Sequence, residues 1–199
     1  MDLSRVSAYT PEPVSGAGQQ AAVLAPILVR DGETHVLFTK RADHLGEHPG
    51  QMSFPGGSRE PEDATLQTTA LREADEEIGL RSKEAAVFGR LDDILTVTDY
   101  SVRPFVAAVP NRAYDPDERE VAEVVPLAVS DLVDLDNYES ERREFSGYGC
   151  RRIHYFHVGD YTVWGATGLM LAQLLELTTD WTVPEEPDRV VDSDAELPV

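Results

Sequence analysis

The chain of 199 residues has one cysteine, two lysines and no apolar run of the roughly 18 residues that a membrane helix needs. The single cysteine, Cys150, excludes an intramolecular disulfide and fits a reducing compartment. The N-terminus also has no charged region followed by an apolar one, as a secretory leader would have. We therefore expect a cytoplasmic protein without a membrane partner.

Basic residues are scarce relative to acidic ones. The chain has 17 Lys and Arg against 37 Asp and Glu, which gives a formal net charge of -20 at pH 7. Because binding to a phosphate backbone needs an excess of Lys and Arg, we expect no nucleic-acid partner. Two explanations of the acidity stay open. One is a halophilic surface, whose self-repulsion is screened at high salt, and the other is an ordinary acidic cytosolic protein.

The apolar content of 41% is sufficient for a hydrophobic core, and the length is typical of one domain. Apolar runs predict strands at 21–29 and 34–39, joined by the Asp-Gly hairpin signal at 31–32. Strands outnumber the two long helices that are expected, one in the middle of the chain and one near its end. This pattern predicts an α/β (α+β) fold, a mixed sheet covered by helices.

Both ends of the chain differ in composition from the middle. Residues 1–19 are polar and contain Pro and Gly, which predicts a flexible arm, whereas the acidic residues 180–199 predict a mobile tail. The folded domain is expected at 20–179.

The most informative stretch is 54–80, a Pro-Gly-Gly turn followed by a helix that carries Glu73, Glu76 and Glu77. Positions i, i+3 and i+4 share one helix face, so three like charges are crowded together. A divalent cation such as Mg²⁺ or Mn²⁺ would relieve their repulsion, because it takes oxygen ligands. A neighbouring face is apolar and can pack on a core, through Leu66, Ala70, Ala74 and Ile78.

Three nearby residues refine this prediction. Asp63 is the expected N-cap, Gly79 is the expected C-terminal cap, and Arg72 is expected to pair with Glu76 four residues further on. The alternative for the carboxylates is a solvated acidic face. The glycine turn and Arg72 favour the metal site.

The segment 54–80 resembles the Nudix box, GX5EX7REUXEEXGU, in which U is aliphatic. The second half of the motif matches position by position over residues 72–80. The first half departs from it. The spacing from Gly57 to Arg72 is one residue longer than in the general pattern, and Ala64 stands where that pattern has a glutamate.

The longer spacing is similar to that of one branch, the coenzyme A pyrophosphatases, whose upstream signature resembles LLTXRSX3RX3GX3FPGG. Residues 37–42, Gly50 and 54–57 match it in spacing, but its second arginine is Gly46 here. The segments TVTDYSVRPFVAAV, EVAEVVPL and VWGATGLML also look like that branch, so the resemblance covers about residues 20–178.

The resemblance implies an α/β/α sandwich and an enzyme, a Nudix hydrolase that uses Mg²⁺ or Mn²⁺ to cleave coenzyme A or its derivatives to 3′,5′-ADP and 4′-phosphopantetheine. Gly46 keeps open another nucleoside diphosphate derivative, such as ADP-ribose or NADH. A third alternative is a non-catalytic nucleotide-binding module. The oligomeric state is open, with a homodimer as one alternative.

The resemblance also implies roles for individual residues. The catalytic group is Arg72, Glu73, Glu76 and Glu77, with the general base at Glu73, Glu120 or Glu123. The metal ligands are Glu73, Glu76, Glu77 and the backbone carbonyl of Gly57. The expected substrate contacts are Arg41, Gly50, Phe54, Gly56, Gly57 and Arg103.

Overall fold

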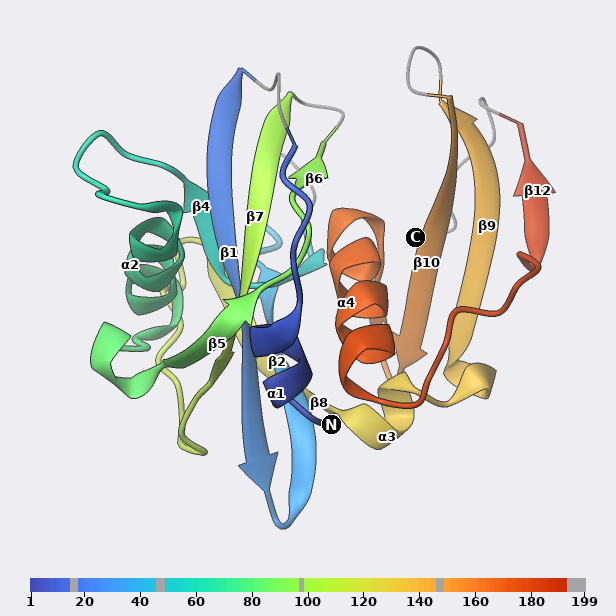
Figure 1. Cartoon of the computed structure of the whole chain (residues 1–199). Coiled ribbons are helices and arrows are strands. Elements are labelled where there is room, and N and C mark those ends of the chain that lie inside the picture. Colours follow the sequence, from blue (N-terminus) through green and yellow to red (C-terminus); the bar gives the residue numbers. More distant parts are fainter. Residues whose placement is uncertain (15–17, 46–48, 97–98, 146–148, 193–199) are drawn as a thin grey trace.

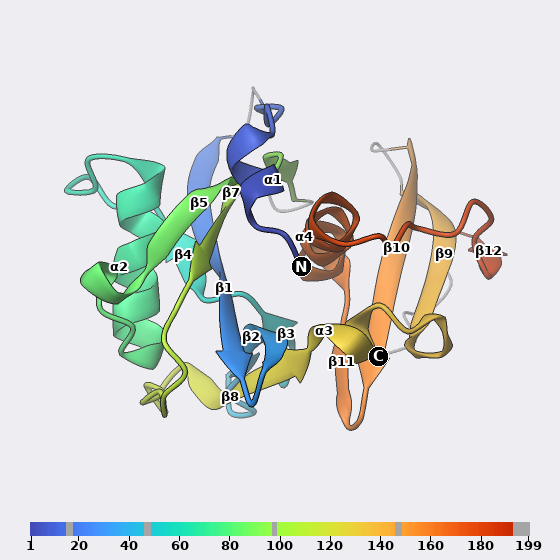
Figure 2. The ribbon, with the colours of Figure 1, turned by 60° about the horizontal axis from the view of Figure 1, so that its bottom comes forward.

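The computed structural model describes residues 1–14, 18–45, 49–96, 99–145 and 149–192. Four layers follow one another: helix α2 (Leu66–Ile78), a mixed sheet, helix α4 (Gly165–Thr178) and a second sheet (Figure 1). A view turned by 60° shows the same order, with α2 and α4 on opposite sides of the first sheet (Figure 2). This confirms the predicted α/β/α sandwich and adds a second sheet behind α4.

The first sheet is built on the predicted hairpin, β1 (Gln19–Arg30) and β2 (Glu33–Arg41). Its two turn residues, Asp31 and Gly32, both have positive φ, at 52° and 84°, as the tightest hairpin turns require. The remaining strands add to this pair. Among the described strands of this sheet, the pairing of β1 with β7 is parallel and the other pairings are antiparallel. The added strands are β3 (Met52–Ser53), β4 (Gly56–Ser58), β5 (Ala86–Arg90), β6 (Ile94–Leu95), β7 (Tyr100–Ala108) and β8 (Val121–Ala128).

Each face of the first sheet has its own apolar core, because side chains alternate along a strand. On β2, Leu37 packs in the core under α2, whereas Val36 and Phe38 pack in the core with α4. The predicted apolar stripe of α2 is confirmed, since all four of its residues are buried: Leu66, Ala70, Ala74 and Ile78.

The second sheet contains the hairpin of β9 (Tyr138–Phe145) and β10 (Gly149–Val158), flanked by β11 (Tyr161–Val163) and β12 (Arg189–Val191). The short helix α3 (Val129–Leu132) and a 3-10 turn (Leu135–Asn137) connect the two sheets, and another 3-10 turn (Ser82–Glu84) follows α2. Within the described ranges, no helix has the length and apolar character to cross a bilayer.

The predicted flexible arm is instead packed where it is described. Helix α1 (Ser4–Ala8) buries Val6 in the core beside α4, and the Tyr9 hydroxyl donates to Asp92 (3.0 Å). Val6 is buried in this polar segment, and Met1 and Leu3 pack against the same core, contacts that the overall composition of the segment does not predict.

The predicted mobile tail is likewise ordered as far as residue 192. Trp181 is buried against Tyr138, and β12 pairs in parallel with β9. Arg189 donates to Glu141 (2.9 Å), so an ion pair fixes the strand in place. Residues 193–199 lie outside the described residues.

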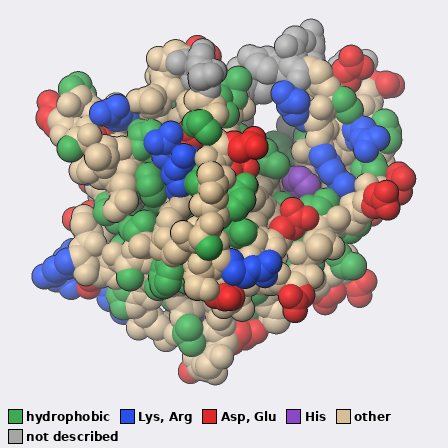
Figure 3. All heavy atoms as spheres, viewed as in Figure 1, with side chains coloured by type: hydrophobic (Ala, Val, Ile, Leu, Met, Phe, Trp, Pro, Cys, Tyr) green, Lys and Arg blue, Asp and Glu red, His purple; other side chains and the backbone are tan. Residues whose placement is uncertain are grey.

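Charge is distributed over the surface in both signs. In the space-filling view, acidic and basic side chains are interspersed and acidic groups occur all round the outline (Figure 3). The acidic residues on this face therefore occupy many separate positions and do not form one patch.

Candidate active site

Helix α2 begins at a cap that differs from the predicted one. Thr65 is the N-cap and its hydroxyl accepts from the Thr68 N–H (3.1 Å). Asp63 is not the cap, because its side chain turns inward to bond Arg72 and Thr69. The C-terminal cap is Gly79, as predicted, with φ of 64°.

Arg72 connects the carboxylates of α2 to the turn before it. Its Nη1 donates to Glu76 (2.9 Å), which confirms the predicted pair. Its Nη2 donates to Glu73 (3.0 Å), to the Ser58 carbonyl (3.0 Å) and to Asp63 (3.1 Å). These bonds hold the pKa of Asp63 down, at about 2. One guanidinium thus fixes two of the three predicted metal carboxylates.

The glycine turn holds the third carboxylate. The Gly56 N–H donates to Glu77 Oε2 (3.2 Å), and β4 places Gly56 and Gly57 beside Val23 and Ala22 of β1. Gly57 lies against the Glu73 carboxylate. The turn and the helix are therefore in direct contact, as the predicted site requires.

The acidic helix face opens into a cavity of about 340 Å³. A loop that follows Pro116 closes its other side, and the Asp117 N–H donates to the Glu77 carbonyl (2.9 Å) at the end of α2. This bond holds the loop against α2, so that the predicted residue Glu120 lies beside the carboxylates of the helix. The lining residues are Glu73, Glu76, Glu77, Asp117, Arg119 and Glu120.

Asp117 and Arg119 are site residues that sequence reasoning missed. They pair with each other (Nε–Oδ1, 2.9 Å), and this bond lowers the pKa of Asp117 to about 2. They stand in a polar loop without any motif spacing. The only sequence feature that could have pointed to them is that two residues of opposite charge follow Pro116 closely.

The electrostatics of the cavity favour a cation. Burial raises the pKa of Glu77 to about 8, although the Gly56 N–H opposes the shift, and the charges of Glu73 and Glu120 raise it further. Burial also raises the pKa of Glu73, against the effect of Arg72. Arg41 lowers the pKa of Glu77, so its charge acts on this carboxylate.

The donor set fits Mg²⁺ or Mn²⁺, because these ions prefer carboxylate and carbonyl oxygens. Across the ranges that the structure describes, no three Asp, Glu, His or Cys side chains already converge as a closed metal cage. Glu73 and Glu76 instead bond Arg72. An ion would therefore have to draw the carboxylates together, and the metal-ligand roles stay predictions.

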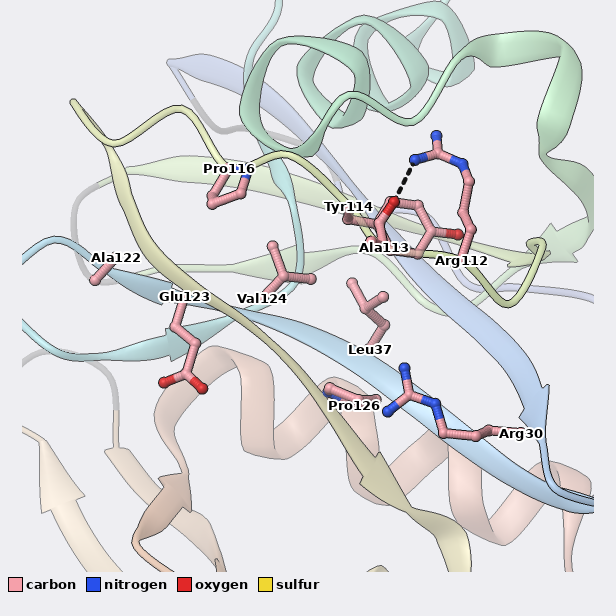
Figure 4. Close-up of a pocket in the computed structure, with 10 residues that line it drawn as sticks. All are labelled: Arg30, Leu37, Arg112, Ala113, Tyr114, Pro116, Ala122, Glu123, Val124 and Pro126. Carbon is pink, nitrogen blue, oxygen red and sulfur yellow. Dashed lines mark hydrogen bonds between the residues drawn. The ribbon is translucent and has the colours of Figure 1, made fainter.

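Glu123 is separated from the carboxylate cavity. It lines a second cavity of about 330 Å³, together with Arg30, Leu37 and Pro126 (Figure 4). In this view its carboxylate points away from Arg30 and Arg112. It accepts a hydrogen bond from the Tyr161 hydroxyl (2.9 Å). Of the two downstream candidates for the general base, only Glu120 lines the carboxylate cavity.

The structure places two of the predicted substrate contacts elsewhere. Phe54 is 2% exposed and stacks on Phe38, with ring centroids 5.1 Å apart, so it is a core residue. Arg103 lies on β7 and bonds the buried Asp93 through two nitrogens (2.8 and 2.6 Å). Both residues lie in segments that resemble the family signature. The resemblance alone did not separate residues with a structural role from residues that can contact a substrate.

The remaining upstream positions are at the end of β2. The Gly50 N–H donates to the Arg41 carbonyl (3.1 Å), and Gly50 has φ of 73°, which a glycine adopts without strain. The backbone of the exposed Arg41 is thus hydrogen-bonded directly to that of Gly50. Gly46, where the coenzyme A signature has its second arginine, lies outside the described residues.

Comparison with known proteins gives a consistent result. The NUDIX domain family model matches residues 18–149. The protein named "Uncharacterized Nudix hydrolase NudL" of Yersinia pestis (strain Pestoides F) is 34% identical over 163 residues, which cover 81% of either chain.

Solved structures show a similar fold at low sequence identity. RenU, a Nudix hydrolase from M. smegmatis, matches with a TM-score of 0.50 and 22% identity over 58% of this chain and 74% of that one. A MutT/nudix family protein from Enterococcus faecalis matches with a TM-score of 0.50 and 13% identity over 78% of this chain and 54% of that one.

Proposed function

This chain belongs to the Nudix hydrolase family, and we propose that it hydrolyses the diphosphate of coenzyme A or a derivative, giving 3′,5′-ADP and 4′-phosphopantetheine. The observation that carries the proposal is the cavity in which Glu73, Glu77 and Glu120 come together beside the glycine turn. An anionic diphosphate can enter such a cavity only with a cation, which explains the need for Mg²⁺ or Mn²⁺.

The carboxylates of Glu73, Glu76 and Glu77, with the Gly57 carbonyl, would hold the cation. When bound, the ion stabilises charge on the phosphate oxygens and acidifies an attacking water. Arg72 keeps Glu73 and Glu76 on the cavity side of α2 through its bonds to both. Arg41, whose charge already acts on Glu77, is the residue we assign to the substrate phosphate.

Glu120 is the general base in this proposal. It lines the same cavity as Glu73 and Glu77, whereas Glu123 lies in the second cavity and bonds Tyr161. Glu120 would accept a proton from the water whose oxygen attacks phosphorus, while the bond between phosphorus and the bridging oxygen breaks.

The preference for coenzyme A rests on the match of residues 37–57 to the signature of the coenzyme A branch. The Gly50 N–H donates to the carbonyl of Arg41, both in that match, and the N–H of the next residue, Ala42, donates to the carbonyl of Glu120 (2.9 Å), which lines the cavity. The missing second arginine, at Gly46, favours a second candidate, hydrolysis of another nucleoside diphosphate derivative such as ADP-ribose or NADH.

A substrate panel tests the proposal. Coenzyme A, ADP-ribose and NADH are each incubated with Mg²⁺ or Mn²⁺, and the products are separated by anion-exchange chromatography. We expect 3′,5′-ADP from coenzyme A at the highest kcat/KM of the panel. Turnover of ADP-ribose without release of 3′,5′-ADP would overturn the coenzyme A assignment alone. The absence of turnover with every substrate and both metals would favour a nucleotide-binding module.

A further inference from the structure

Asp63 is a buried carboxylate with a complete set of partners. It is 4% exposed and accepts from Arg72 Nε (3.3 Å), Arg72 Nη2 (3.1 Å), the Thr69 hydroxyl (2.9 Å) and the Glu60 N–H (3.0 Å). Nearly all of its acceptor capacity is directed at one guanidinium and at the groups that hold the carboxylate beside it.

The same guanidinium contacts two residues of the carboxylate cavity. Arg72 donates to Glu73 (3.0 Å) and to Glu76 (2.9 Å). An arginine without a carboxylate of its own would be balanced by these two, and it would compete with a cation for them. Because Asp63 already balances Arg72, the bonds to Glu73 and Glu76 orient these carboxylates and leave their charge available.

The sequence around Asp63 supports a dedicated role. Ala64 stands where the general Nudix pattern has a glutamate, and the spacing to Arg72 is one residue longer. The backbone before α2 turns Asp63 inward and leaves capping to Thr65. The chain thereby places a different acid next to Arg72.

We infer that Asp63 is a positioning residue for the metal carboxylates, acting through Arg72 and not through contact with metal or substrate. The inference rests on the proposed metal-dependent function. Its competitor is a purely structural role, in which Asp63 only fastens the loop before α2 to the helix.

The test measures metal binding without substrate. Mn²⁺ is titrated into wild type and Asp63→Asn, and the free ion is followed by its paramagnetic resonance signal. We expect about a tenfold weaker Mn²⁺ affinity in Asp63→Asn, the lower end of what outer-shell substitutions cost. We also expect kcat/KM to recover partly at high Mg²⁺, and Asp63→Glu to restore part of the affinity.

Glu141→Gln is the matched control. Glu141 is 1% exposed and also holds arginines, Arg143 (2.8 Å) and Arg189 (2.9 Å), but in the second sheet. Glu141→Gln should lower the melting temperature as Asp63→Asn does, without changing the Mn²⁺ affinity. If Asp63→Asn does not fold, Thr69→Val removes one bond to the Asp63 carboxylate and should weaken Mn²⁺ binding about two- to threefold, because Asp63 keeps its charge and its bonds to Arg72.

The possible outcomes distinguish the positioning role of Asp63 from the proposed metal-dependent function. Wild-type Mn²⁺ affinity and wild-type Mg²⁺ dependence in Asp63→Asn, or in Thr69→Val where that variant is used, would overturn the positioning role and leave the proposed function intact. A wild-type protein that binds no Mn²⁺ would overturn both. An equal loss of affinity in Glu141→Gln would show a general stability effect and would also overturn the positioning role.

Discussion

A Cβ added to Gly57 would lie 2.6 Å from Oε1 of Glu73. The absence of a side chain at position 57 therefore creates the space in which this carboxylate rests. The backbone at Gly57 and the carboxylate of Glu73, the first predicted metal ligand of α2, are therefore in direct contact.

Gly57→Ala should thus act on the site more than on the fold. Position 57 has no positive φ, and the clashing atoms belong to the end of a flexible side chain, so Glu73 can swing away. We expect at least a tenfold loss of kcat/KM, as for an outer-shell metal substitution, with a change in stability of about 1 kcal/mol or less. Steady-state kinetics and thermal unfolding measure the two effects.

Gly56→Ala provides the contrast at the neighbouring position. A Cβ there would lie 2.4 Å from the Ala22 carbonyl oxygen and 2.5 Å from the Val23 Cα, both backbone atoms of β1. We expect a loss of about 3 kcal/mol or more in the free energy of unfolding, because β1 cannot yield as a side chain does. Equal destabilisation by both variants would contradict this distinction.

Glu77→Gln should abolish turnover and keep the fold. The amide retains an oxygen for the Gly56 N–H bond but loses the charge that a cation requires. We expect kcat to fall at least about 100-fold with little change in melting temperature. Asp75→Asn is the matched control, since Asp75 is an exposed acid on the same helix and does not line the cavity. Unchanged activity of Glu77→Gln would refute the metal role.

The two downstream acids can be separated by one pair of variants. Glu120→Gln should lower kcat about 100-fold or more if Glu120 is the general base, with a smaller change in KM. Glu123→Gln should lose far less, because Glu123 lies in the second cavity. A larger loss in Glu123→Gln, measured under the same Mg²⁺ concentration, would reverse the assignment.

Local patterns in the sequence predicted local structure well. The Asp31-Gly32 turn, the apolar stripe of α2 and the Gly79 cap each depend on neighbours within a few residues, and the structure confirms all three. The Arg72–Glu76 pair, one helical turn apart, belongs to the same class. The carboxylate face of α2 was predictable for this reason.

Contacts between distant segments were not predictable in the same way. Thr65 caps α2 because the Asp63 side chain turns toward Arg72, nine residues further along the chain. Asp117 reaches the cavity because its N–H bonds the end of α2, and a loop of this kind has no periodic signal. Arg189 pairs in parallel with Glu141, which is far away in the chain. The acidic composition of the tail therefore gave no indication of the strand that this pairing forms.

The buried imidazole of His154 predicts a specific dependence of stability on pH. His154 is 5% exposed and Nδ1 bonds the Tyr138 hydroxyl at 2.7 Å. Burial lowers its pKa to about 4, and the charge of Arg152 acts in the same direction. The unfolded chain, with a pKa near 6.5, then binds more protons than the folded one between these values.

The stability contributed by neutral His154 is therefore complete above about pH 6.5 and is lost as the pH falls toward 4. The full loss is about 3 kcal/mol, from roughly 1.4 kcal/mol for each pKa unit. His154→Gln keeps a polar partner for Tyr138 but cannot take up a proton. We expect the free energy of unfolding of the wild type, measured with urea, to fall between pH 7 and 4.5 by about 2–3 kcal/mol more than that of the variant. Parallel curves for the two proteins would contradict the assignment.

The net charge of -20 predicts how stability responds to salt if the surface is halophilic. The 37 acidic residues are spread along the whole chain, so their mutual repulsion is not confined to one segment and opposes the compact state. The screening length falls from about 10 Å at 0.1 M to about 3 Å at 1 M salt, which removes most of this repulsion. We expect the melting temperature to rise steadily with KCl up to molar concentrations. A flat or falling curve would instead support an ordinary acidic protein, whose ion pairs, such as Arg72–Glu76, lose as much by screening as the dispersed acids gain.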